Sequence, residues 1–346
     1  MVFIVNSHLD IPYATTRHDS NKPDHAPSTR NPYQESNLTT SVLVTGGAGF
    51  IGSHLVEELV SEGNKVSVLD NFSNKQPKTP GNQFELIEGD VCDPQNVLDA
   101  TKSVDVVYHL AAVLGVEYAY QHPIDTLEVE IMGTRNILEG MRKNDVKMVI
   151  YGSSSEVYGE PSSLPIAETD RTSPKSTYGV AKLAGERYCE AYRRAYGIEY
   201  VILRYFNVYG PRQDDRFVIP RFVRAALQGA PLEIYGDGNQ VRDFTFVKDA
   251  VRLTLTATQV SRAKNQVFNV GTGVPTKASE LADLILKLSN SKSSIVLKNF
   301  DKSNRPREIE IFNRLADINK AQQLGYKPQT PMREGIAATI NWMQTR

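Results

Sequence analysis

Short apolar runs alternate with longer segments of helical periodicity along the first part of the chain. The predicted strands are, in order, Val42–Thr45, Lys65–Asp70, Phe84–Glu88, Asp105–Leu110, Lys147–Tyr151 and Glu199–Arg204. Apolar residues at helical spacing predict helices between several of them, the clearest over Phe50–Glu62 and Ser176–Tyr196. This alternation is typical of an α/β fold whose parallel sheet carries helices on both faces. We therefore predict a doubly wound parallel sheet over residues 41–210.

The pattern changes after Gly210. Gly-Pro-Arg, Ile-Pro-Arg and Tyr-Gly-Asp-Gly turns interrupt shorter elements from there on. Helices are predicted over Glu280–Leu288 and Met332–Met343, and Val267–Val270 is predicted to be a strand that returns to the sheet. We expect residues 211–346 to form mainly a smaller, substrate-binding domain, with segments near 241–271 returning to the first domain.

The N-terminal residues 1–40 differ from the rest of the chain. From Asn6 to Thr40 they are rich in Pro, Asn, Ser, Thr and Asp and have little apolar periodicity, which predicts a flexible arm. The alternative is an arm that packs on a neighbouring subunit. The opening Met-Val-Phe-Ile-Val is too short for a signal-peptide core, and no apolar run reaches the roughly 20 residues that span a bilayer. We therefore expect a cytoplasmic protein.

Composition narrows the choice of ligands. The 346 residues carry a formal net charge of −1, so no charge excess favours nucleic acid or an anionic membrane as a partner. An anionic ligand must then be bound by local arginines. Cys92 and Cys189 are the only cysteines, and the six histidines have no metal-ligand spacing, so we predict neither a disulfide framework nor a metal site.

A glycine cluster follows the first predicted strand, in the run Thr45-Gly-Gly-Ala-Gly-Phe-Ile-Gly52. Glycines at this spacing allow a sharp turn, a close approach of backbone NH groups to a pyrophosphate, and tight packing of the next helix on the strand. The second strand ends in Asp70, whose carboxylate is placed to accept both hydroxyls of an adenosine ribose and to repel a 2′-phosphate. The sequence therefore predicts a Rossmann-type dinucleotide site that prefers NAD to NADP.

Further cofactor contacts are expected at the carboxyl ends of the strands. The predicted cofactor-binding residues are Gly46, Gly49, Phe50, Ile51, Gly52, Asp70, Asn71, Asp90, Val91, Leu110, Ala111, Ala112, Tyr178 and Lys182. For the apolar members of this set, packing in the core is the alternative.

Tyr178 and Lys182 lie four residues apart in the helical run Ser176-Thr-Tyr-Gly-Val-Ala-Lys182, so their side chains share one face of the helix. The ammonium charge, added to that of an oxidised nicotinamide, favours phenolate and lowers the tyrosine pKa from about 10 towards neutrality. Tyr178 is therefore a candidate general base.

These motifs, together with Ser153-Ser-Ser-Glu-Val-Tyr-Gly159 and Arg204-Tyr-Phe-Asn-Val-Tyr-Gly-Pro-Arg212, occur in an order that resembles the extended short-chain dehydrogenase/reductases acting on nucleotide sugars. The resemblance runs from about Ser41 to the C-terminus. In that family a tightly held NAD oxidises the sugar at C4. The resemblance implies that Ser154 supplies the hydroxyl, Tyr178 the base, and Lys182 the group that binds the nicotinamide ribose.

The resemblance also implies a site for the nucleotide diphosphate. Its residues would be Asn207, Arg242 and Arg305, and guanidinium groups suit this task because they bind phosphate oxygens through paired NH donors. The chain departs from the family at Arg305-Pro-Arg-Glu-Ile309, where the usual pattern is Arg-x-Gly-Asp-Val.

Glu156 is the residue on which the choice of reaction depends. Four-epimerases of this family usually carry a small residue there, whereas Ser-Glu, as in this chain, is similar to decarboxylases of UDP-glucuronate and some dehydratases. The Arg204–Gln213 segment resembles the epimerases. We predict a nucleotide-sugar 4-epimerase acting on a UDP-hexose, with a 4,6-dehydratase or a decarboxylase as the alternative. In those alternatives Glu156 is an acid/base catalyst.

Two further hypotheses concern the class of protein and its assembly. A catalytically silent NAD-binding regulator would need the glycines and Asp70, but not Ser154, Tyr178 or Lys182. The helical stretches Pro123–Lys143 and Ser176–Tyr196 resemble the pair that forms a four-helix dimer interface in the family, so we expect a homodimer.

Overall fold

The computed structural model describes residues 39–73, 83–113, 115–300 and 306–345. These residues belong to one compact unit, Leu38–Arg346. The predicted N-terminal arm, apart from its last two residues, and Arg305 lie outside the described residues. The boundary predicted near residue 210 stays a prediction.

A seven-stranded parallel sheet forms the centre of the fold, in the order β10-β6-β5-β4-β1-β2-β3. Its strands are β1 (Ser41–Thr45), β2 (Lys65–Asp70), β3 (Glu85–Glu88), β4 (Val106–His109), β5 (Met148–Ser154), β6 (Glu199–Tyr205) and β10 (Gln266–Val270). This order is that of a doubly wound Rossmann-type sheet with one added strand, so the predicted fold class is confirmed.

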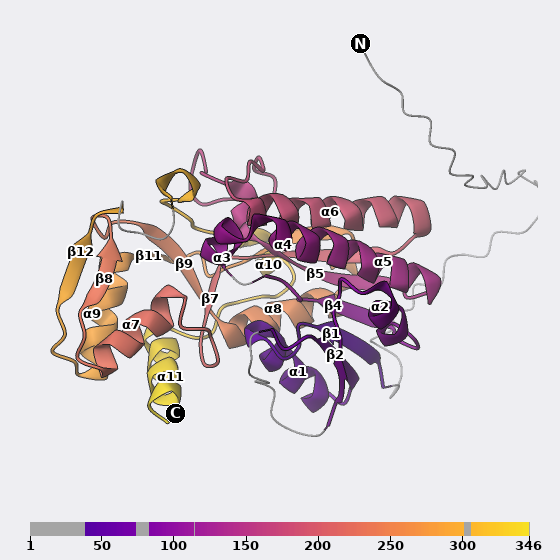
Figure 1. The fold of residues 1–346 in the computed structure, drawn as a ribbon, viewed down its shortest axis with the longest axis horizontal. Helices are drawn as coiled ribbons and strands as arrows, with labels where there is room; N and C mark the ends of the chain where they lie inside the picture. The colour runs from indigo at the N-terminus through magenta and orange to yellow at the C-terminus, as the bar shows by residue number, and fades with distance from the viewer. Residues whose placement is uncertain (1–38, 74–82, 114, 301–305, 346) are drawn as a thin grey trace, which may run out of the picture. The chain divides into compact units, whose positions relative to one another are not determined.

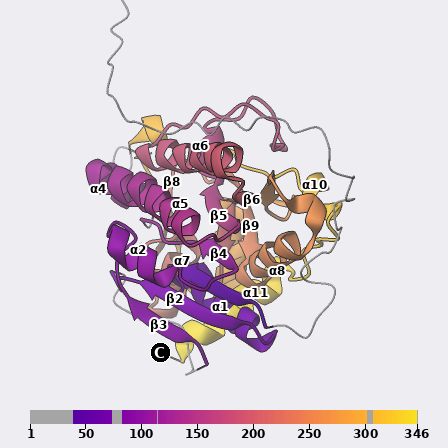
Figure 2. The ribbon, with the colours of Figure 1, turned by 90° about the vertical axis from the view of Figure 1, so that its right-hand side faces the viewer.

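Helices cover both faces of the sheet (Figures 1 and 2). One face packs against α1 (Phe50–Ser61) and α8 (Val247–Gln259). The opposite face packs against α2 (Pro94–Ala100), α5 (Gly133–Lys143) and α6 (Thr177–Tyr196). Because both faces are buried, the central strands carry continuous apolar runs, such as Met-Val-Ile-Tyr at the start of β5, and every residue of β5 is buried. This continuity is the pattern from which the strands were predicted.

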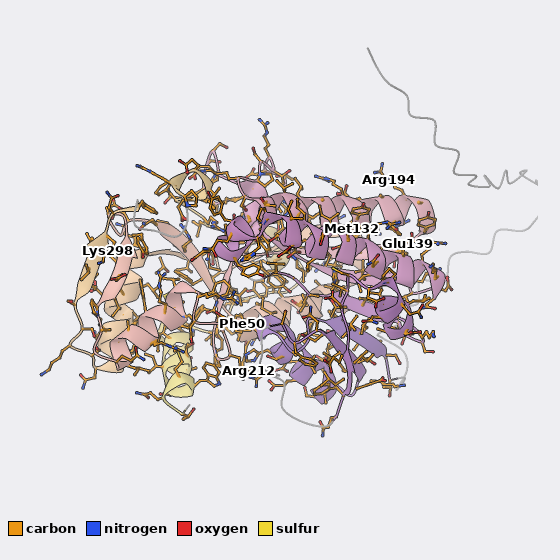
Figure 3. All side chains as sticks on the ribbon, viewed as in Figure 1. Phe50, Met132, Glu139, Arg194, Arg212 and Lys298 are labelled. Carbon is orange, nitrogen blue, oxygen red and sulfur yellow. The ribbon has the colours of Figure 1, made fainter. Side chains whose placement is uncertain are left out.

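The predicted helix over residues 123–143 is a composite run. It consists of α4 (Pro123–Leu127), a π-helical turn η1 (Glu128–Met132) and α5, preceded by the short helix α3 (Val116–Gln121). Met132 and Glu139 lie along this run, next to α6, which ends near Arg194 (Figure 3). A π-helical turn has one residue more than an α-helical turn and often marks a functional site.

The later part of the chain forms two smaller sheets with their own helices. One sheet has the order β11-β9-β7, with β7 (Asn207–Tyr209), β9 (Val241–Phe246) and β11 (Pro275–Lys277). The other pairs β8 (Leu232–Tyr235) with β12 (Ile295–Lys298). The remaining α-helices are α7 (Val218–Leu227), α9 (Ala278–Ser289), α10 (Asn319–Gln322) and α11 (Met332–Gln344). Over the described residues no helix has both the length and the apolar character needed to cross a membrane.

Candidate active site

The glycine cluster forms a tight turn between β1 and α1. Gly46 has φ of +69°, and a Cβ atom on Gly52 would lie 2.2 Å from the Gly46 carbonyl oxygen, so the loop and helix can approach this closely only without side chains. Helix α1 begins at Phe50 with Gly49 as its N-cap and has no side-chain cap. Its first NH groups and the positive end of the helix dipole suit a pyrophosphate, as the sequence predicts.

Asp70 lies at the end of β2 and braces the same loop. Its Oδ2 accepts a hydrogen bond from the Ala48 backbone NH at 3.0 Å, and its Oδ1 accepts one from the Phe72 NH at 2.9 Å. Asn71, directly after β2, donates to Asp90, which follows β3, at 3.0 Å. Burial would raise the pKa of Asp90, but hydrogen bonds from Cys92 and Asn71 lower it below its ordinary value. These carboxylates are therefore held at the edge where the adenosine is expected.

The other predicted cofactor residues lie on neighbouring strand ends. Ala111 NH donates to Thr45 Oγ1 at 3.2 Å, and a Cβ on Gly46 would lie 2.7 Å from the Ala111 nitrogen, so residues 110–111 pack directly on the glycine turn. Val91 is buried against Gly133 of α5. The glycine turn, the uncapped helix start and Asp70 together fit a bound NAD.

The structure brings Ser154, Tyr178 and Lys182 together at the carboxyl end of β5. Ser154 is the last residue of β5 and is buried. Helix α6 starts after Ser176, whose Oγ accepts the Gly179 NH at 3.1 Å, and this cap positions Tyr178 in the first turn. The Ser154 hydroxyl is close enough to Tyr178 to favour its phenolate form, and the Lys182 Nζ lies 5.7 Å from the centre of the Tyr178 ring.

Lys182 has a partner that the sequence analysis did not identify. Its Nζ lies 2.8 Å from Oε2 of Glu130, and both side chains are almost completely buried. Burial first, and then the Glu130 and Glu156 carboxylates, raise the pKa of Tyr178 well above its ordinary value. The sequence predicts a lowered pKa for Tyr178. That prediction assumes that no carboxylate neutralises the Lys182 charge and that the charge of an oxidised nicotinamide is present as well. In the protein alone the pKa of Tyr178 is raised, first because burial disfavours the phenolate and then because the Glu130 and Glu156 carboxylates repel its charge.

Glu156 is also paired. It lies in the 3₁₀ turn η2 (Ser155–Tyr158), and its Oε1 is 2.7 Å from Nη2 of Arg314, with both side chains buried. Ser176 Oγ donates to Glu156 Oε2 at 3.4 Å. Among the described residues, none accepts a hydrogen bond from the Arg314 Nε. Nothing in the local sequence singles out Arg314, because the contact joins segments far apart in the chain.

Two of the predicted substrate residues occupy adjacent strands of a small sheet. Asn207 begins β7, and its Oδ1 is buried without a hydrogen-bond donor among the described residues. Arg242 lies on β9, which pairs with β7, and its guanidinium contacts Glu310 at 2.5 Å and the Phe312 carbonyl oxygen at 2.8 Å. The orphaned Asn207 oxygen fits a ligand, whereas Arg242 must share its guanidinium with Glu310.

The parts of the chain that the structure describes contain no cluster of three His, Cys, Asp or Glu side chains that could hold a metal ion. The buried His109 side chain contacts hydroxyl groups instead, with Nδ1 2.8 Å from Thr45 Oγ1 and Nε2 3.1 Å from Thr134 Oγ1. Burial, together with the charge of Lys182, lowers the pKa of His109 to about 3. His109 is therefore neutral and joins β1, β4 and α5.

The chain is similar to known proteins over most of its length. The model of the NAD dependent epimerase/dehydratase family matches residues 42–271. A putative UDP-glucose 4-epimerase of Methanocaldococcus jannaschii is 41% identical over 310 residues, which are 88% of this chain and 98% of the relative. A UDP-N-acetyl-alpha-D-glucosaminuronate decarboxylase of Bacillus cytotoxicus is 39% identical over 316 residues, 87% of this chain and 97% of the relative. The crystal structure of UDP-glucose 4-epimerase from Thermotoga maritima with UDP-glucose superposes with a TM-score of 0.83 at 34% identity, covering 88% of this chain and 99% of that one.

Proposed function

The chain belongs to the NAD-dependent epimerase/dehydratase family, and from that premise we propose that it is a nucleotide-sugar 4-epimerase that acts on a UDP-hexose. The family and its NAD dependence confirm what the sequence predicts. The observation that carries the proposal is the meeting of Ser154, Tyr178 and Lys182 at the carboxyl end of β5, at the same edge of the parallel sheet as the glycine turn. A regulator that only binds NAD would not need these three side chains together.

In this proposal the protein moves one proton and orients the sugar. Tyr178 takes the proton of the sugar O4 hydroxyl, and the neighbouring Ser154 hydroxyl orients the two groups. When bound, NAD supplies the acceptor for the C4 hydride and later returns it. Once the 4-keto sugar presents its other face, Tyr178 would give the proton back to O4 as the hydride is returned to C4. No atom is gained or lost in the cycle.

Asn207 and Arg242 are proposed to contact the nucleotide part of the substrate. The support is the orphaned Oδ1 of Asn207 and the adjacent guanidinium of Arg242 on the paired strand. A diphosphate oxygen would compete with Glu310 for that guanidinium. The solved structure of the Thermotoga maritima relative contains UDP-glucose.

A second candidate function is decarboxylation of a nucleotide uronic acid. The observation that favours it is the buried Arg314 next to Glu156, since a guanidinium with an unbonded Nε can receive a sugar carboxylate. One relative of similar identity is named as a decarboxylase. The pairing of Glu156 with Arg314 gives no such support to a dehydratase.

We also propose that the protein is a cytoplasmic homodimer. Large apolar side chains are exposed along α4, η1 and α6, namely Ile124 at 64%, Met132 at 42% and Val180 at 47%. Helices α4 and α6 are in contact, so these residues belong to neighbouring elements and suit burial against a second copy. Cys92 and Cys189 are free thiols, as expected in a reducing compartment.

The test is incubation of the purified protein with UDP-glucose, UDP-N-acetylglucosamine and UDP-glucuronate, followed by mass spectrometry and proton NMR. A new isomer of unchanged mass supports the epimerase, and a product lighter by carbon dioxide supports the decarboxylase. If no sugar reduced the bound NAD or gave a product, both functions would be wrong.

A further inference from the structure

Glu130 connects two parts of the site. Its Oε2 lies 2.8 Å from the Lys182 Nζ, and its Oε1 accepts a hydrogen bond from the Val113 backbone NH at 2.9 Å. Val113 directly follows the predicted cofactor residues 110–112 at the end of β4. One carboxylate thus holds both the strand-end loop expected to contact NAD and the lysine beside the catalytic tyrosine.

The backbone holds this carboxylate in place through the π-helical turn Glu128–Met132. Thr134 Oγ1 donates to the Glu130 carbonyl oxygen at 2.5 Å and also contacts His109. Glu130 is 1% exposed, whereas Glu128 in the same turn is exposed. The buried carboxylate is therefore fixed on its own turn as well as through its two partners.

The charged and polar groups around Tyr178 come from five elements and from the segment that carries Arg314. Lys182 lies on the same helix, and Glu130 approaches from η1. Glu156 lies in η2, where Arg314 pairs with it. His109 of β4 and Tyr151 of β5 face Lys182, and Ser154 of β5 contacts Tyr178. With His109 neutral, the two carboxylates balance the lysine and the arginine, so the protein by itself offers no net positive charge to a phenolate.

We propose that Glu130 is a positioning residue that holds Lys182 and cancels its charge, so that Tyr178 stays protonated until the nicotinamide charge arrives with NAD. The proposal rests on the proposed role of Tyr178 as the base. In this role Glu130 acts on Tyr178 through Lys182 and does not contact the substrate. Removing the Glu130 charge makes phenolate easier to form, because a like charge near an acid disfavours its ionised form.

Glu130→Gln is the central variant, since an amide keeps the shape and can still accept the Val113 NH. The rate of NADH formation in a single turnover is measured against pH. The acidic limb of this pH–rate profile is expected to lie about one pH unit lower in Glu130→Gln than in the wild type. Glu128→Gln removes the same formal charge from the exposed surface of the same turn. That control is expected to have the wild-type pH profile.

A second readout does not depend on turnover. The protein is labelled with ¹³C at the tyrosine Cζ, and Tyr178→Phe identifies the Tyr178 resonance among the 16 tyrosines. In the NAD complex, the Tyr178 resonance of Glu130→Gln should titrate at lower pH than that of the wild type. If the glutamine variant fails to fold, Glu130→Asp keeps the charge at a shorter reach, and it should lower the rate while leaving the pH profile in place.

Three outcomes would overturn the proposal. The first is that Tyr178 titrates at the same pH in the wild type and in Glu130→Gln. The second is that the pH–rate profile of Glu128→Gln shifts as far as that of Glu130→Gln. The third is that the pH–rate profile of Glu130→Asp differs from that of the wild type. The proposed function fails differently. Activity that survives Tyr178→Phe removes the tyrosine as base, whereas the Cζ titration still reports whether Glu130 controls its charge.

Discussion

Tyr178 is the residue whose chemistry the proposed mechanism needs most. Replacing it by Phe keeps the ring packed at the start of α6 but removes the proton acceptor. We expect Tyr178→Phe to fold and bind NAD while losing turnover by a factor of about 10² to 10⁴. Tyr196→Phe, at the exposed end of the same helix, is the matched control and should keep wild-type activity. A Tyr178→Phe rate within a few-fold of wild type would exclude Tyr178 as the base.

Asp70 has two roles. Its carboxylate accepts hydrogen bonds from the Ala48 and Phe72 NH groups, and it lies where the adenosine ribose is expected. Asp70→Ser should weaken NAD binding and narrow the preference for NAD over NADP, because the charge that repels a 2′-phosphate is gone. Calorimetric titration with both cofactors measures this. Asp99→Ser, an exposed carboxylate on α2, should change neither affinity. Tighter binding of NADP than of NAD by the wild type would contradict the assignment.

His109 joins three elements, and its buried neutral ring gives the stability of the fold a pH dependence. Its pKa falls from the ordinary 6.5 to about 3 because of burial and Lys182. The unfolded chain therefore binds a proton in this range that the folded protein does not, and stability present above about pH 6.5 is lost as the pH falls. The His109 contribution to that slope is about 1.4 kcal/mol per pH unit.

Urea unfolding between pH 5 and 8 tests this slope. His109→Gln should flatten the decline below pH 6.5, whereas His122→Gln, on an exposed ring, should not. Identical slopes in His109→Gln and the wild type would show that the ring is not held neutral.

Elements were more predictable from the sequence than contacts between them. The strands of the central sheet are buried on both faces, so each leaves an apolar run that a reader of the sequence can see, as in β5. The short strand β7 and the π-helical turn leave no such signal, because one has only three residues and the other interrupts a helical pattern without changing its composition. The helix-start motif of Tyr178 was visible because its spacing is local.

The ion pairs that adjust the site were invisible for a related reason. Glu130 meets Lys182, and Glu156 meets Arg314, only after segments far apart in the chain have packed. A single carboxylate in a helical pattern more often faces the solvent. The sequence alone therefore predicts an exposed position for Glu130 and Glu156, both of which are buried. Ser154, Tyr178 and Lys182 could be predicted from the motifs, but the charges that control them could not.

At the scale of the whole molecule, the exposed apolar residues of α4 and α6 predict the assembly. Ile124→Asp combined with Val180→Asp should convert a dimer into a monomer, because two buried charges per subunit would face each other across the helices. Size-exclusion chromatography with light scattering measures the mass. Leu297→Asp, an equally exposed leucine on β12, should leave the dimer intact. A monomeric wild type would contradict the proposed interface.

The central claim is that a hydride leaves C4 of a UDP-hexose and returns to the same carbon, and that Tyr178 transfers only the proton of the O4 hydroxyl. The most direct measurement is the reaction in D₂O, with the product returned to H₂O and analysed by mass spectrometry and NMR. The account predicts a C4 epimer of unchanged mass with no deuterium bound to carbon, and Glu156→Gln should retain most of this activity. A product that has lost water or carbon dioxide and carries deuterium on the sugar ring would contradict it and would make Glu156 an acid/base catalyst.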